Sequence, residues 1–73
     1  MLMYYVYILK INNKFYIGYT EDLQRRVKQH KVKGEVRLIY YEAYLSKKPA
    51  INREKKLKNY GSAWRALRKR ITA

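Results

Sequence analysis

YIGYTEDLQRRVKQH, residues 16–30, joins the end of an expected strand to a helix whose packing face carries two costly polar side chains. Leu23 and Val27 are the clear apolar residues of that helix. The face they define continues through Arg26 and His30 at three- and four-residue spacing. Polar groups on a packing face are unfavourable unless they have a partner. Arg26 and His30 are therefore the first candidates for a functional site.

Composition predicts one small, folded, strongly basic domain. We expect all 73 residues, 1–73, to form it, because a chain of this length cannot be divided into two cores. With 48% apolar and 15% aromatic residues, it is too hydrophobic for a disordered basic tail. Eighteen Lys and Arg residues against five acids give a net charge of +13, which attracts a polyanion.

Nucleic acid is the expected polyanion, and an anionic membrane surface is the alternative. The tyrosines are spread over strand-like segments and do not line one face of a basic amphipathic helix, which favours nucleic acid. Residues 1–11 are apolar but lack a basic leader and a small-residue cleavage site, and they are too short to cross a bilayer. We expect a cytoplasmic protein without membrane contact, associated with the nucleoid.

The chain has no cysteine and one histidine, which excludes disulfides, thiol chemistry, zinc fingers and histidine-cluster metal sites. A metal, if used, must be held by carboxylate, water and substrate oxygens. Magnesium is usually held in this way.

The pattern of apolar residues predicts strands and helices in the order ββαβαα, an α+β fold. Residues 3–11, MYYVYILKI, are apolar on both alternations, which indicates a strand covered on both faces and central in its sheet. Further strands are expected at 14–19 and 36–45, and helices at 20–33, after Ser46, and at 63–71.

Local signals mark where these elements meet. Asn12 and Asn13 tolerate the left-handed conformation of a tight hairpin turn. Gly18 weakens its strand unless another group approaches the backbone closely there. Thr20 is the expected N-cap of the first helix, and Gly61 is the expected C-cap of the second.

Arg26 and His30 present a fixed cation and a near-neutral base to the same point in space. This pair suits a phosphodiester. The planar guanidinium binds two phosphate oxygens and opposes charge that grows in the transition state, while the imidazole takes or relays a proton. The alternative is a surface helix whose histidine only borders the core.

Glu54 is the second unusual residue. Ala50, Ile51, Leu57 and Lys58 mark the inner face of the second helix, and Glu54 lies in the middle of it. A buried carboxylate is normally ion-paired, protonated or bound to a metal. Both a metal site and an ion pair with a nearby lysine or arginine remain open.

Tyrosines at 5, 7, 16 and 19 lie on the first two strands. Together they form a patch that stacks bases or offers hydroxyls to a phosphate, or they simply pack in a half-covered sheet. The lysines and arginines of the last two helices form a solvated rim that also binds phosphate backbone.

These residues, in this order and spacing, resemble the GIY-YIG nuclease family, in particular its small single-domain members. Tyr5-Val6-Tyr7 stands where the first triplet belongs, and Tyr16-Ile17-Gly18 matches the second. Arg26 lies ten residues beyond Tyr16 and His30 fourteen, as the family's catalytic arginine and histidine do. The segment NREKKLK, which holds Glu54, is similar to the segment that carries the metal-binding glutamate.

The resemblance implies a three-stranded antiparallel sheet flanked by helices, and hydrolysis of nucleic-acid phosphodiesters with one Mg²⁺ or Mn²⁺ ion. It implies that Glu54 holds the metal. Tyr16, helped by His30, would orient or deprotonate the attacking water, and Tyr7 would complete their hydrogen-bonded cluster. Arg26 would stabilise the pentacovalent phosphate.

The leading hypothesis is therefore a metal-dependent endonuclease that acts on DNA, with RNA as the other substrate, and selects structure rather than sequence. A role in DNA repair fits this activity. One active site cuts one strand, so a double-strand break needs a homodimer or two events. The alternative is a nucleic-acid-binding module of the same fold without catalysis, and a third interpretation is a basic RNA-associated structural protein.

Overall fold

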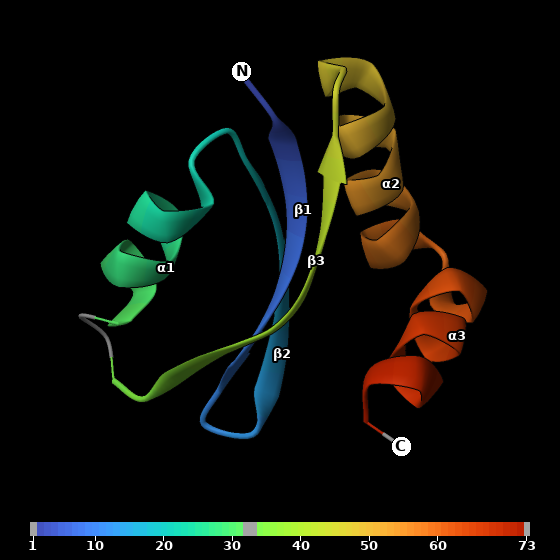
Figure 1. Cartoon of the computed structure of the whole chain (residues 1–73). Coiled ribbons are helices and arrows are strands. Elements are labelled where there is room, and N and C mark those ends of the chain that lie inside the picture. Colours follow the sequence, from blue (N-terminus) through green and yellow to red (C-terminus); the bar gives the residue numbers. More distant parts are fainter. Residues whose placement is uncertain (1, 32–33, 73) are drawn as a thin grey trace.

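The computed structural model of the chain describes residues 2–31 and 34–72. Its elements follow the predicted order ββαβαα, so the α+β fold is confirmed (Figure 1). The strands are β1 (Tyr4–Ile11), β2 (Lys14–Thr20) and β3 (Val36–Tyr44), and the helices are α1 (Leu23–Lys31), α2 (Lys47–Asn59) and α3 (Gly61–Ile71). Among the described residues, no helix is long and apolar enough to cross a membrane.

β1 is the central strand, as its two apolar faces predicted. The sheet order is β2-β1-β3, and both neighbours pair with β1 in the antiparallel direction. The turn between β1 and β2 has Asn12 and Asn13 at φ 51° and 67°, the left-handed values that asparagine tolerates. The β1–β3 register shifts between Ile8 and Leu9, where one residue of β3 is left unpaired.

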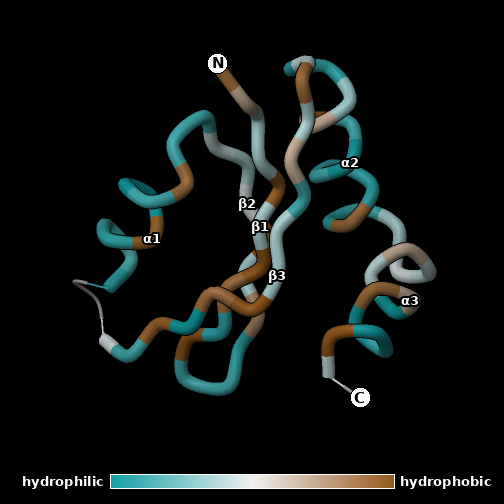
Figure 2. Tube along the Cα trace, in the orientation of Figure 1, coloured by the Kyte–Doolittle hydropathy of each residue, from teal (hydrophilic) through white to brown (hydrophobic). Residues whose placement is uncertain are grey.

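Helices cover both faces of the sheet, with α1 on one face and α2 and α3 on the other (Figure 1). In Figure 2 the tube of α1 is mostly hydrophilic, whereas apolar colour concentrates in the sheet between the helix layers. Apolar residues therefore pack on both faces of β1, in two clusters that share this strand. The larger core contains Val6, Ile8, Ala50, Leu57 and Leu67, and the core under α1 contains Tyr7, Leu9, Ile11 and Val36, against which Leu23 and Val27 pack.

The start of α1 differs from the prediction. The helix begins at Leu23, and its N-cap is Asp22, whose carboxylate Oδ1 accepts a hydrogen bond from the Arg25 backbone N–H at 3.1 Å. Thr20 is buried at the end of β2, and its hydroxyl accepts a hydrogen bond from the Asp22 N–H at 3.0 Å. Thr20 thus shapes the turn before the cap. The predicted helix also extended over residues 32–33, which lie outside the described residues.

The junction of α2 and α3 is also tighter than expected. Ser46 occupies the N-cap of α2, as predicted, but its side chain makes no capping hydrogen bond. Tyr60 is both the C-cap of α2 and the N-cap of α3. Gly61 is therefore the first residue of α3 and not a C-cap. A single extended residue joins the two helices.

Candidate active site

The site forms where the Tyr7 ring crosses β2. Tyr7 and Gly18 are partners in the β1–β2 register, on the face that α1 covers. A Cβ atom at position 18 would overlap Cζ and Oη of the Tyr7 ring. Gly18 therefore provides the close approach to the backbone that its place in a strand suggested, and the Tyr7 hydroxyl lies above the edge strand.

His30 meets this hydroxyl from α1. Leu23 and Val27 pack against the core under the helix, and this contact orients His30 toward the sheet. The His30 side chain is half-buried. The Tyr7 hydroxyl lies 3.5 Å from His30 Nε2, a long hydrogen bond, and the two rings meet edge to face at a centroid distance of 6.3 Å. The structure thus brings together two residues that are 23 positions apart in the sequence.

Two charged residues act on the same hydroxyl. Burial raises the pKa of Tyr7 above its ordinary value, the nearby Arg26 guanidinium lowers it in part, and the Glu54 carboxylate raises it further. Tyr7 is 4% exposed and neutral at physiological pH. It can therefore donate and accept hydrogen bonds between a cation from α1 and an anion from α2.

Arg26 itself is exposed, whereas the helix pattern placed it on the packing face. The short helix α1 covers little of the sheet, so position 26 lies at the border of the contact, where the guanidinium stays hydrated. Arg26 lines an open hollow, whose other residues are Thr20, Glu21, Asp22, Arg25 and Gln29. An exposed guanidinium at the rim of a hollow is free to meet an incoming phosphate.

Tyr16 lies on the same face of β2 as Gly18, because alternate residues of a strand share a face. Its side chain is 47% exposed. It lies two residues before Gly18 on this strand, and its side chain reaches solvent beside the candidate site.

The four tyrosines of the first two strands, for which the sequence left a shared patch or simple packing open, divide between the two faces of the sheet. Tyr19 lies on the face of α2 and α3, where its hydroxyl is buried without a hydrogen-bond partner and burial raises its pKa. Tyr5 shares the α1 face with Tyr7 and meets the exposed Tyr41 of β3 edge to face at 6.0 Å. The strand alternation itself separates Tyr16 from Tyr19.

Glu54 lies on α2 with a side chain that is 20% exposed. Its Oε2 forms an ion pair with Nζ of Lys58, one helical turn later, at 3.2 Å. Lys58 is half exposed and does not belong to the inner face where the sequence pattern placed it. The ion pair left open by the sequence is therefore present.

Metal binding at Glu54 depends on the donors around it. Within residues 2–31 and 34–72, no group of three His, Cys, Asp or Glu side chains could hold a metal ion. One partly exposed carboxylate suits an ion such as Mg²⁺, which keeps most of its ligands as water and substrate phosphate oxygens. A divalent ion that binds together with its substrate would fit the residues present, and Glu54 would be its protein ligand.

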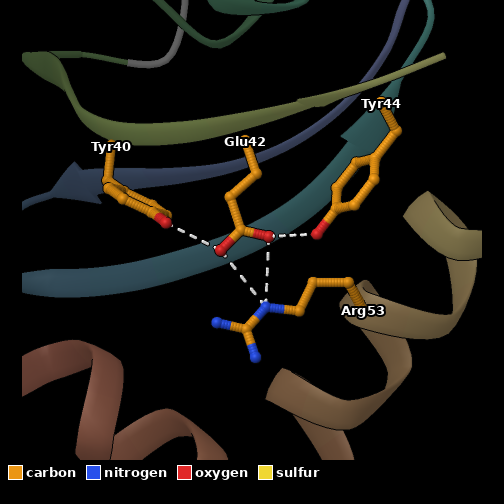
Figure 3. Close-up of polar contacts among 4 residues, drawn as sticks. All are labelled: Tyr40, Glu42, Tyr44 and Arg53. Carbon is orange, nitrogen blue, oxygen red and sulfur yellow. Dashed lines mark hydrogen bonds and ion pairs between the residues drawn. The ribbon is translucent and has the colours of Figure 1, made fainter.

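A second carboxylate cluster was not predicted (Figure 3). Glu42 of β3 accepts hydrogen bonds from the Tyr40 hydroxyl at 2.7 Å and the Tyr44 hydroxyl at 2.5 Å. Nε of Arg53 lies 3.1 Å and 3.2 Å from its two oxygens. Arg53 precedes Glu54 on α2, so this cluster fixes how α2 is rotated against β3. Its signal in the sequence is an acid between two tyrosines at alternate positions of one strand.

The chain is similar to known proteins in sequence and in fold. The sequence of residues 3–68 matches the family model of the GIY-YIG catalytic domain. The chain belongs to the GIY-YIG family, a family of the nuclease type.

Among its relatives are proteins named UPF0213. One from Staphylococcus epidermidis is 36% identical over 67 residues, which cover 78% of this chain and 82% of that protein. Another from Haloquadratum walsbyi is 34% identical over 68 residues, which cover 78% of this chain and 75% of that protein. The solution NMR structure of a UPF0213 protein from Bacillus halodurans, 28% identical, covers 96% of this chain and 87% of its own with a TM-score of 0.66.

Proposed function

We propose that this protein is a divalent-metal-dependent endonuclease that hydrolyses DNA phosphodiester bonds and selects its substrate by structure. The observation that carries the proposal is the Tyr7 hydroxyl, held over Gly18, in hydrogen-bond reach of His30 and in the electrostatic field of both Arg26 and Glu54. Membership of a nuclease-type family supports it. The proposal places the protein in the cytoplasm, on the nucleoid.

The proposal gives each residue a role that is consistent with its position. The exposed Arg26 binds a phosphate oxygen and opposes the charge that develops on the phosphate. Tyr16 orients the attacking water, and the half-buried His30 imidazole accepts its proton. Tyr7 holds the His30 ring by hydrogen bonding to Nε2. Glu54 would hold a divalent ion, which would supply electrostatic stabilisation of the developing negative charge.

A non-catalytic nucleic-acid-binding module is the second candidate. The Glu54 carboxylate is paired with Lys58, and this ion pair competes with a metal. In such a module, Arg26 and His30 hold phosphate without turnover. The net charge of +13 supports binding in either case.

Cleavage of labelled DNAs separates the two candidates. Single-stranded, duplex, flap and branched-junction DNA are incubated with Mg²⁺ or Mn²⁺ and with wild type, Glu54→Gln, or the control Glu35→Gln, which removes an exposed acid elsewhere. A nuclease cleaves only with metal, loses cleavage in Glu54→Gln while keeping its affinity, and retains cleavage in Glu35→Gln. Binding by all three proteins without cleavage by any would contradict the nuclease and support the binding module.

A further inference from the structure

Three cations meet on the face of the sheet opposite His30, beside the β1–β2 turn. Lys10 of β1 is the cross-strand partner of Phe15 on one side and of Arg37 on the other. Lys10 Nζ lies 5.7 Å from the centroid of the Phe15 ring, and Cζ of Arg68 lies 5.3 Å from it. Trp64 of α3 contacts the same ring edge to face at 5.4 Å.

A groove opens between this part of the sheet and the end of α3. Lys10, Phe15 and Arg37 line it from the sheet, and Ile71 and Thr72 line it from the end of α3. Figure 1 shows the end of α3 at the level of the β1–β2 turn. Two cationic side chains and one aromatic ring therefore line the same groove.

Lys10 and Arg37 are unfavourable neighbours. Like charges directly opposite each other on paired strands destabilise a sheet. Within the described parts of the chain, the ion pairs are Arg53–Glu42 and Lys58–Glu54, so neither neutralises this pair. Glu35 lies beside the two cations in an adjoining hollow and forms no ion pair with them. The repulsion is relieved when an anion lies between them.

We propose that Lys10, Arg37 and Arg68 form a second phosphate-contact site for DNA, separate from the candidate active site. Arginine binds two phosphate oxygens through its planar fork, and lysine adds a point charge. A recessed groove accepts a narrow phosphodiester backbone, whereas a flat bilayer surface cannot enter it. The choice of DNA as partner rests on the proposed function, but the site requires only a nucleic-acid backbone.

The position of the second site suggests a reason for structural selectivity. Tyr7, Tyr16 and His30 of the candidate active site lie on the α1 face, and Glu54 acts on Tyr7 from α2. The second site lies on the face of α2 and α3, beside the β1–β2 turn. The sheet lies between the Tyr7–His30 pair and the second site, in a protein whose Cα trace extends 31 × 29 × 19 Å. A straight duplex meets one face, whereas two arms of a flap or junction reach both. Branched DNA therefore gains contacts that a linear duplex does not.

The test is binding without metal, so that it is independent of cleavage. A labelled branched junction and a linear duplex of equal length are titrated in EDTA at several salt concentrations. The proteins are wild type, Lys10→Gln/Arg37→Gln and the control Lys47→Gln/Lys48→Gln, which removes two exposed lysines at the start of α2. We expect the first double variant to lose about 10- to 100-fold in junction affinity, with a salt slope lower by roughly two.

The same variant should lose much less affinity for the linear duplex, and the control should keep the preference for the junction. Equal losses by both double variants on both DNAs would overturn the site, because only diffuse charge would then be acting. Retained junction binding together with lost binding to phosphatidylserine vesicles would also overturn it, in favour of a membrane. Because cleavage is not measured, failure of the nuclease proposal and failure of this site give different results. A protein that prefers junctions through this site but cleaves no DNA supports the site and contradicts the nuclease.

The repulsion between Lys10 and Arg37 can be tested separately, through the melting temperature. At low salt and without DNA, Arg37→Gln should raise the melting temperature by about 2–5 °C, because it removes the repulsion from Lys10. A lower melting temperature would remove the observation on which the site rests.

Discussion

At position 18 the absence of a side chain lets the Tyr7 ring lie across β2 and bring its hydroxyl to His30. The ring is buried, so it cannot move aside without disturbing Leu9 and Val36 in the same core. The requirement for glycine here is steric, since its backbone does not adopt a positive φ. One missing methyl group thus determines where the candidate catalytic hydroxyl lies.

Gly18→Ala should therefore displace the Tyr7 ring and reduce both stability and activity. We expect a loss of about 1–3 kcal/mol in the free energy of unfolding, the usual cost of overpacking, measured by urea denaturation. Gly61→Ala is the matched control, because a Cβ there meets nothing within 4 Å. The control should be neutral or slightly stabilising. A Gly18→Ala protein as stable as the control would contradict the packing described for Tyr7.

Tyr7→Phe keeps the ring and removes only the hydroxyl. We expect cleavage of a flap substrate to fall about 100-fold, the low end of effects on proton-transfer groups, with a change in melting temperature of a few degrees at most. Tyr5→Phe, on the same strand and face, is the control and should keep its cleavage rate. Equal rates in both variants would show that the hydroxyl near His30 has no catalytic role.

At the level of elements, α2 links the Glu42 cluster to the candidate active site. Arg53 binds Glu42 of β3, while the next residue, Glu54, acts on Tyr7. Neighbouring residues on a helix point about 100° apart, so a rotation of α2 that breaks the Arg53 contact also moves the Glu54 carboxylate. The cluster in Figure 3 therefore positions the metal-ligand candidate without belonging to the site.

This cluster predicts acid sensitivity. Burial alone would raise the pKa of Glu42, but hydrogen bonds from Tyr44, Tyr40 and Arg53 lower it below its ordinary value of 4.5. A lowered pKa in the folded state means that the stabilisation is complete above pH 4.5 and is lost as the pH falls through the folded-state value. Glu42→Gln should cost about 2 kcal/mol at pH 7 and show less loss of stability between pH 5 and roughly 3.

The measurement is the midpoint of urea unfolding across that pH range for wild type and Glu42→Gln. Glu35→Gln, which removes an exposed acid, should follow the wild-type curve. Parallel curves for wild type and Glu42→Gln would show that the cluster contributes no pH-dependent stability.

Over the whole molecule, the net charge of +13 on a small domain lowers the stability of the folded state. Such an excess repels itself in the folded state and favours binding to a polyanion. This net charge already subtracts the five acids, so the two ion pairs among the described residues do not reduce it. Stability without a ligand should therefore depend on ionic strength.

We expect the melting temperature to rise by several degrees between 0.02 M and 0.3 M NaCl, because the screening length falls below about 10 Å above 0.1 M. The double variant Lys47→Glu/Lys48→Glu, which removes part of the excess charge, should show a smaller rise. Scanning calorimetry of both proteins provides the comparison. A melting temperature independent of salt in wild type would mean that self-repulsion is not significant.

Much of the fold followed from local pattern. Alternation on both faces of residues 3–11 predicted the central strand, and two asparagines predicted the turn. The spacing of Tyr16, Arg26 and His30 indicated the family, which the match to residues 3–68 confirms. These predictions held because strand and helix periodicities and turn preferences arise between residues close in the chain.

The site depended on contacts between distant residues. Sequence spacing placed Arg26 and Lys58 on inner faces, yet both are exposed, because the area that a neighbouring element covers decides which borderline positions are buried. The Tyr7–His30 pair and the pairing of Arg53 with Glu42 join separate elements. Strand register and helix rotation set these contacts, and both are fixed only when the whole core packs at once.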